Sequence, residues 1–171
     1  ANISSVTTLT LGNNTNVSNL TGIEDFSALE SLSIAGNTHI TSLDIRSNNS
    51  LKTLYANEAS QLNSLDITGL TSLETITLNN ALVTSLDVST NTGLKVFNIG
   101  NAPLASIDLS NNSNLVSFYF TNNTTLTDID LSNNSSLINV LGASSNIRTL
   151  NLKNGNNGSM NLFGFIGATN L

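Results

Sequence analysis

The chain of 171 residues contains no cysteine and no tryptophan, and it has a single proline and a single histidine. Without cysteine it can form no disulfide, offer no thiolate nucleophile and build no cysteine-ligated metal site. The one histidine, His39, cannot make a multi-histidine metal centre and leaves little room for histidine acid–base chemistry. The sequence also has no nucleophile-elbow, phosphate-loop or dinucleotide motif. These absences predict that the protein is not an enzyme.

Charge and long apolar runs are also scarce. Charged residues make up 9% of the chain, and its five Lys and Arg against eleven Asp and Glu give a net charge of −6. That balance argues against a nucleic-acid partner and against binding to anionic membranes. No apolar run approaches the roughly 18 residues of a membrane-spanning helix, so we expect no membrane insertion.

The chain is rich in small polar residues and in leucine. Asn, Ser and Thr contribute 30, 24 and 21 residues, and Leu contributes 27. A hydrophobic content of 39% together with low charge is not typical of a disordered chain. This composition indicates a regular array, and a repeat is present.

Two apolar triplets alternate along the chain. The first recurs at steps of 21 or 22 residues, at 43–45, 65–67, 86–88, 107–109, 129–131 and 150–152. The second lies midway between these, at 32–34, 54–56, 76–78, 97–99, 118–120 and 140–142. In each triplet the outer residues are two apart, so both point to one face of a strand while the middle residue points away. The polar stretch after each triplet is typical of a turn.

These spacings predict an all-β-rich solenoid with coils of 21–22 residues, two parallel β-sheets and little or no helix. Only 10 or 11 residues separate successive strands, which is too few for a helix and two turns. Stacked coils bury an apolar interior that one coil cannot bury alone. Asparagines at a fixed turn position are expected to point inward and to satisfy the backbone as an Asn ladder; simple turn preference is the alternative. They are Asn37, Asn48, Asn91, Asn112, Asn123 and Asn134, while Ala59, Ala81 and Ala102 interrupt the series.

The motif Leu-x-x-Leu-x-Leu-x-x-Asn, clean at 126–134, resembles the leucine-rich repeat. The segment 19–32 resembles the start of internalin-type repeats, and the doubled motif at 104–112 resembles secreted leucine-rich repeat proteins of Bacteroidetes, particularly flavobacteria. This resemblance implies a secreted or cell-surface bacterial protein, usually multidomain. The sequence departs from these relatives where their second strands carry cysteine, because it has Ala56, Leu78, Ile99 and Phe120 there. We expect one domain: an N-terminal segment and first coil at 1–28, the solenoid at 29–159, and the start of a truncated C-terminal cap at 160–171.

The middle residue of the first triplet forms an acidic column on one outer face. Its members are Asp44, Asp66, Asp87, Asp108 and Asp130. Aspartates on adjacent strands repel by roughly 0.8 kcal/mol per pair in bulk water. Raised carboxylate pKa values, bound cations or a basic partner would relieve that repulsion. We therefore hypothesise that the acidic column binds a cationic partner or calcium, with Asp108, Asp128 and Asp130 as the calcium candidates; merely solvated aspartates are the alternative. No cofactor other than calcium is expected.

The middle residue of the second triplet forms a neutral aromatic column on the other face. Its candidate binding residues are Tyr55, Thr77, Asn98 and Tyr119. Tyrosine on a neutral background suits contact with a protein or a glycan, although it is also a good strand residue.

Together these features predict a non-catalytic extracellular recognition or adhesion module that binds a protein or glycan through a sheet face. A structural spacer or accessory subunit of a larger surface assembly is the alternative. An ice-binding surface built on the threonines of the second sheet is a lower alternative, because Val96 and Asn98 interrupt the threonine array.

Overall fold

The computed structural model describes residues 3–13, 16–143 and 145–164. Within these ranges it contains twelve three-residue strands and three short 3₁₀ helices, η1 (Ile3–Ser5), η2 (Ile23–Asp25) and η3 (Asn157–Ser159). The strands are β1 (Thr8–Thr10), β2 (Ser31–Ser33), β3 (Ser42–Asp44), β4 (Thr53–Tyr55), β5 (Ser64–Asp66), β6 (Thr75–Thr77), β7 (Val96–Asn98), β8 (Ser117–Tyr119), β9 (Asp128–Asp130), β10 (Asn139–Leu141), β11 (Thr149–Asn151) and β12 (Asn161–Phe163). No helix in the described part of the chain is long or apolar enough to cross a membrane.

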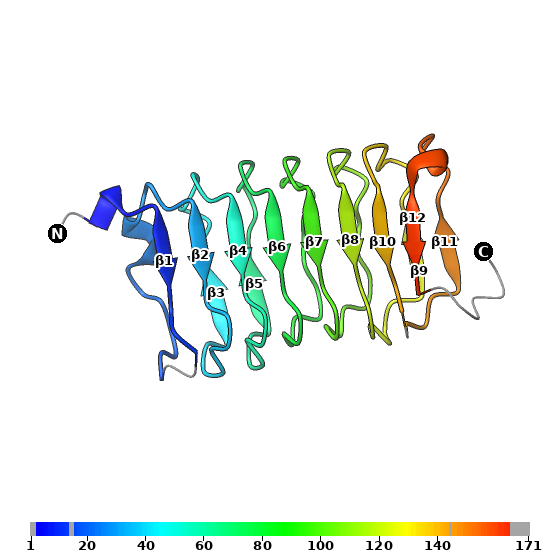
Figure 1. Cartoon of the computed structure of the whole chain (residues 1–171). Helices are drawn as coiled ribbons and strands as arrows, with labels where there is room; N and C mark the ends of the chain where they lie inside the picture. The colour runs from blue at the N-terminus through cyan, green and yellow to red at the C-terminus, as the bar shows by residue number, and fades with distance from the viewer. Residues whose placement is uncertain (1–2, 14–15, 144, 165–171) are drawn as a thin grey trace.

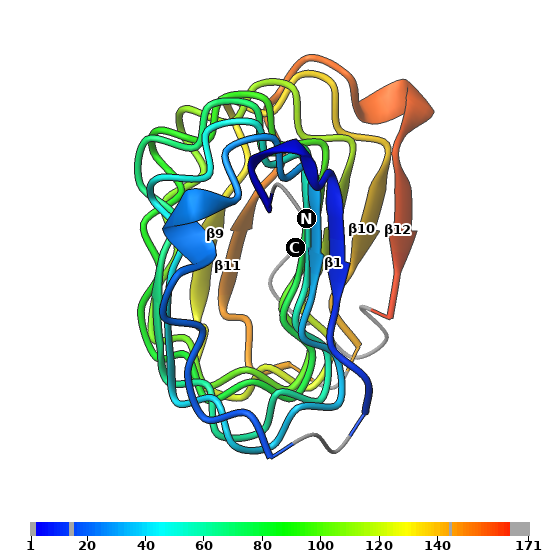
Figure 2. The same ribbon diagram turned by 90° about the vertical axis from the view of Figure 1, so that its left-hand side faces the viewer.

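One wall of the molecule is a continuous parallel sheet. Its eight strands follow the order β1-β2-β4-β6-β7-β8-β10-β12, and each pairs in parallel with the equivalent strand of the next coil. Figure 1 shows these strands side by side along the length of the solenoid, and Figure 2 shows the same wall from one end with a second wall opposite it. The expected β-solenoid of 21–22-residue coils with almost no helix is confirmed. We call this sheet the laddered wall.

The opposite wall, which carries the acidic column, is paired only near its ends. We call it the aspartate wall. β3 pairs with β5 and β9 pairs with β11, each in a two-stranded sheet. Between β5 and β9, a stretch that is described throughout, the equivalent segments 85–88 and 106–109 form no strand. The second sheet that the repeat predicts is therefore present as two short pairs with a gap between them.

The interior is apolar and closely packed. All six inward positions of the coil that begins at Leu29 are buried, with at most 3% of any side chain exposed: Leu29, Leu32, Ile34, Ile40, Leu43 and Ile45. Further along, three phenylalanines fill the space between the walls. The ring centroids of Phe97 and Phe118 lie 5.7 Å apart, and those of Phe118 and Phe120 lie 4.9 Å apart. Such burial contributes about 1.5–3 kcal/mol per large apolar side chain.

The turn asparagines are also buried. Those after the aspartate wall donate their side-chain amide to main-chain carbonyls one coil earlier; for example, Asn91 Nδ2 lies 2.9 Å from both Ile67 O and Leu70 O. After the laddered wall the roles are reversed, because Asn37 Oδ1 accepts the N–H groups of His39 and Ile40. Each amide thus satisfies backbone groups that the turn removes from water. The three alanines that interrupt the series are buried at the same turn position.

The segment expected to start a C-terminal cap begins with another strand of the solenoid. β12 pairs with β10 in register, with Val140 opposite Leu162. Residues 165–171 of that expected cap lie outside the described residues.

Candidate functional site

Each aspartate of the acidic column ends its segment with the same local turn. One carboxylate oxygen, Oδ1, accepts the main-chain N–H two residues later. The donors are Arg46 at 3.2 Å, Thr68 at 3.0 Å, Ser89 at 2.8 Å, Ser110 at 2.9 Å and Ser132 at 2.8 Å. Asn151, the next residue in the column, makes the same bond to Lys153 N–H at 3.2 Å. This Asx turn accounts for Asp or Asn at the position without any ligand, and it does not use the second carboxylate oxygen of the aspartates.

These hydrogen bonds keep the carboxylates ionised. The side chains of Ser89 and Ser110, and then their main-chain N–H groups, lower the pKa values of Asp87 and Asp108 below the ordinary value of 3.8. The Arg46 side chain lowers the pKa of Asp44 to about 2. The sequence suggested that raised carboxylate pKa values could relieve repulsion along the column. That expectation is wrong, because the pKa values are lowered. Donors favour the charged form more than neighbouring carboxylates oppose it.

Among the described residues, the ion pairs of the acidic column lie at one end. Arg46 Nη2 lies 2.7 Å from Asp44 Oδ2, and Arg46 Nε lies 3.3 Å from Asp66 Oδ2. Asp87 and Asp108 form no ion pair among the described residues. The middle of the column therefore carries uncompensated negative charge.

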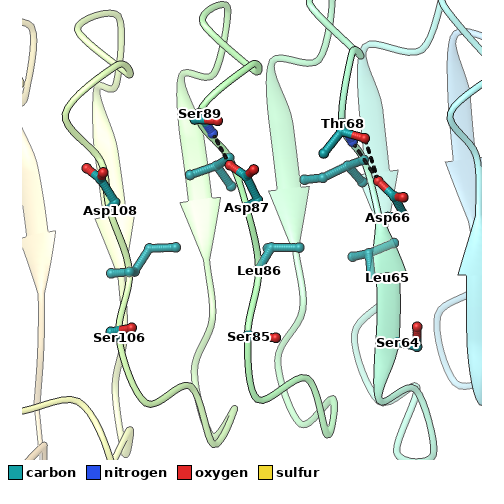
Figure 3. A pocket seen from close by; sticks show the side chains of 13 residues that line it. Ser64, Leu65, Asp66, Thr68, Ser85, Leu86, Asp87, Ser89, Ser106 and Asp108 are labelled. Carbon is teal, nitrogen blue, oxygen red and sulfur yellow. Dashed lines mark hydrogen bonds between the residues drawn. The ribbon is translucent and has the colours of Figure 1, made fainter.

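A groove of about 630 Å³ lies where the aspartate wall is unpaired. Its floor is formed by Leu65, Leu86 and Ile107, which are half-buried, whereas the equivalent Leu43 and Ile129 are only 3% and 2% exposed. Figure 3 shows a column of aspartates along one side of this floor and a column of serines along the other. The two rims are Asp66, Asp87 and Asp108, and Ser64, Ser85 and Ser106. We call this feature the aspartate groove.

The calcium candidates are not gathered into one cluster. In the parts of the chain that the structure describes, no group of three acidic or histidine side chains is placed to hold a metal ion. Asp128 accepts hydrogen bonds from the hydroxyls of Thr127 and Thr149, and it does not line the aspartate groove. Asp108 and Asp130 each belong to their own Asx turn. This geometry gives the calcium hypothesis no support.

The structure brings the neutral aromatic column together in register. Tyr55 lies opposite Thr77, Thr77 opposite Asn98, and Asn98 opposite Tyr119 on β4, β6, β7 and β8. Tyr55 is 42% exposed and the other three are half-buried. The register also places Val96 beside Thr75, so the threonine array that ice binding requires is interrupted on this wall.

One surface feature was missed by sequence reasoning. The residue just before each strand of the laddered wall alternates in charge over four coils, through Glu30, Lys52, Glu74 and Lys95. Lys52 pairs with Glu30 at 3.0 Å and Lys95 pairs with Glu74 at 3.0 Å. The 21- and 22-residue spacing of these charges was the available signal. Because the charges cancel in pairs, this edge is electrically balanced.

Comparison with solved structures supports an internalin-like fold. The functional domain of InlJ from Listeria monocytogenes, which includes a cysteine ladder, is 29% identical with a TM-score of 0.84 over 93% of this chain and 34% of that one. Internalin C2 from the same species is 22% identical with a TM-score of 0.66, over 94% and 80% of the two chains. A leucine-rich repeat protein of Leptospira interrogans is 19% identical with a TM-score of 0.69, over 90% and 47%. The chain thus spans about a third of the InlJ chain.

Sequence comparison shows the family. No curated protein matches the chain significantly. Residues 4–112, more than half of the chain, match the family described as the endo-beta-N-acetylglucosaminidase EndoS LRR domain. The chain therefore belongs to this family of leucine-rich repeat domains.

Proposed function

We propose that this protein is a non-catalytic recognition module that binds a protein ligand through the aspartate wall. The observation that carries the proposal is the aspartate groove, where an apolar floor is open to solvent between two polar rims. Protein interfaces combine a desolvated apolar centre with a polar rim in this way. The open shape suits a surface contact better than the enclosed site that most catalysis requires.

We further propose that the module works outside the cell, on or released from a bacterial surface. The similarity to internalin C2 and to the InlJ domain supports this setting, as does the resemblance to secreted flavobacterial repeats. The family match supports a module that serves a larger protein, because the family is described as one domain of a glycosidase.

Binding to arrays of extracellular proteins and of glycans tests the proposal. The isolated chain is compared with a groove variant, Asp87→Arg/Asp108→Arg, and with a face variant, Tyr55→Ala/Tyr119→Ala, after circular dichroism has confirmed that both are folded. We expect saturable binding to a protein ligand that the groove variant loses and the face variant keeps. Absence of any saturable ligand would instead support a structural spacer.

The neutral aromatic column is a second candidate site, for a protein or a glycan. It is favoured by the in-register stack of Tyr55, Thr77, Asn98 and Tyr119 on a continuous sheet. Tyrosine supplies contact area and a hydrogen bond at low entropic cost. Loss of binding in the face variant alone would assign recognition to this wall.

A further inference from the structure

We propose that the aspartate groove holds an extended cationic segment of a protein partner, with lysine or arginine on Asp87 and Asp108 and aliphatic side chains on the floor. This inference rests on the proposed function and names the chemistry of the ligand.

Charge is the first argument. Arg46 pairs with Asp44 and with Asp66 at one end of the acidic column and lies outside the lining of the groove, so it offsets one of these two negative charges. Asp87 and Asp108 line the groove and have no ion-pair partner among the described residues. Hydrogen bonds from the side chains of Ser89 and Ser110, and then from their main-chain N–H groups, lower the pKa values of Asp87 and Asp108, so both carboxylates are charged at physiological pH. A ligand that brings positive charge removes the mutual repulsion of these carboxylates.

The chemistry of the groove favours ammonium or guanidinium groups over a metal ion. Each coil contributes one aspartate to the rim, and its Oδ1 already accepts a main-chain N–H, at 2.8 Å in Asp87 and 2.9 Å in Asp108. One remaining oxygen per coil cannot supply the six to eight ligands that calcium takes. A lysine or arginine side chain needs only one or two acceptors.

The shape of the groove favours an extended polypeptide. Leu65, Leu86 and Ile107, which line the groove on three successive coils, form an apolar strip beside the aspartates. Hydrogen-bonded strands lie about 4.7–4.9 Å apart, so three unpaired coils span at least roughly 10 Å, and crossing them takes at least three extended residues at about 3.3 Å each. Successive side chains of an extended segment point to opposite sides, so aliphatic residues can face the floor while the long, flexible side chains of alternate basic residues bend over to the aspartate rim.

The test uses three fluorescein-labelled peptides and measures binding by fluorescence anisotropy. Their sequences are Lys-Val-Lys-Val-Lys-Val, Thr-Val-Thr-Val-Thr-Val and Lys-Ser-Lys-Ser-Lys-Ser. We expect saturable binding of the first, at least tenfold weaker binding of the other two, and weaker binding of the first when NaCl is raised from about 50 to about 200 mM. Equal binding of the first and second peptides would overturn the electrostatic argument, and equal binding of the first and third would overturn the argument from the floor.

Matched variants locate the binding. Asp87→Asn/Asp108→Asn keeps both Asx acceptors and removes two charges, and we expect it to weaken binding of the first peptide at least tenfold. Glu24→Gln/Asp25→Asn removes two charges from exposed positions outside the groove and is expected to change the Kd less than twofold. The proposal would be overturned if both variants lost the same affinity for the first peptide, or if the unsubstituted chain showed no saturable binding of it. If the first peptide fails while the protein array still yields a ligand sensitive to Asp87→Arg/Asp108→Arg, the inference is wrong and the proposed function stands.

Discussion

The side-chain amide of Asn112 donates a hydrogen bond to the main-chain carbonyl of Asn91, its equivalent one coil earlier, at 2.9 Å. The same amide nitrogen donates to Val88 O at 3.0 Å, so both of its hydrogens are used. Asn134 repeats the arrangement on Leu109 O at 3.0 Å and Asn112 O at 2.8 Å. All three side chains are fully buried. Each of these asparagines therefore fastens one coil to the coil before it, through main-chain groups that water cannot reach.

Replacing Asn112 by alanine should destabilise the protein by about 2–4 kcal/mol, because two buried carbonyls lose their donors. Asn112→Asp should be worse, since a carboxylate would face those carbonyls with no hydrogen to donate. Chemical denaturation measures both. The exposed neighbour provides the control: Asn111→Ala should stay within about 0.5 kcal/mol of the unsubstituted protein. An unchanged free energy of unfolding in Asn112→Asp would contradict the role assigned to this amide.

Asparagine should replace Asp108 without loss of stability, whereas alanine should cost about 1 kcal/mol. The Asp108→Asn variant would keep the acceptor for Ser110 N–H and relieve repulsion from Asp87 and Asp130; alanine removes the acceptor. Asn151, which forms the same turn in the next part of the column, is the natural precedent. Thermal unfolding of both variants at neutral pH distinguishes the effect of the charge on stability from the effect of the hydrogen bond that forms the turn. Equal destabilisation by the two substitutions would show that the carboxylate itself is structural.

Asp44 should titrate near pH 2, and Arg46→Gln should raise its pKa toward the ordinary value of 3.8. The folded-state pKa lies below the unfolded one, so the contribution of this pair to stability is present above about pH 4 and is lost as the pH falls toward 2. Carboxyl ¹³C chemical shifts measure the titration directly. Lys52→Gln, which breaks the separate ion pair with Glu30, is the control and should leave the pKa of Asp44 unchanged.

Truncation of Phe118 to alanine should cost about 3–5 kcal/mol, because it empties the middle of the stack formed with Phe97 and Phe120. Phe118→Leu keeps most of the volume and should cost less than half as much. Thermal denaturation is the measurement, with a fall in Tm of about 6–20 °C for the alanine variant. A loss below about 1 kcal/mol would mean that the surrounding coils collapse into the space.

Asn101→Val should destabilise the protein by about 1–2 kcal/mol, although the side chain is exposed. Asn101 adopts a φ of 57°, in the left-handed region that a β-branched residue occupies only with strain. Asn101→Gly accepts this conformation and should show no comparable loss. Denaturant midpoints of the two variants give the comparison. Identical midpoints would rule out a conformational origin.

The repeat period predicted most of the fold, because an apolar side chain every two or three residues leaves few ways to build a core. Leu32, Ile34, Leu43 and Ile45 are inward as expected, and the column from Tyr55 to Tyr119 is in register. The Asx turns were also encoded, since an Asp or Asn side chain at the end of a strand readily accepts the main-chain N–H two residues later. Sequence reasoning treated those aspartates only as charges.

The gap in the aspartate wall could not be predicted in the same way. Leu86-Asp87-Val88 reads like Leu65-Asp66-Ile67, yet the latter triplet contributes to β5 and the former to no strand. The two triplets alone give no reason for this difference, because both have an apolar–Asp–apolar pattern. The candidate groove therefore became visible only in three dimensions, although its individual residues stood in the predicted columns.

The uneven pairing of the two walls gives the molecule a preferred direction of bending. The laddered wall is joined by main-chain hydrogen bonds from β1 to β12, so stretching it would break those bonds. Between β5 and β9 the aspartate wall has no paired strands, and isolated main-chain bonds such as Ala105 N–H to Thr84 O at 3.3 Å join its coils there. Bending that separates the coils on the aspartate wall therefore breaks fewer main-chain hydrogen bonds than bending that separates them on the laddered wall. A partner that binds across Leu65, Leu86 and Ile107 would connect the unpaired coils of the aspartate wall and make the solenoid more rigid along its length.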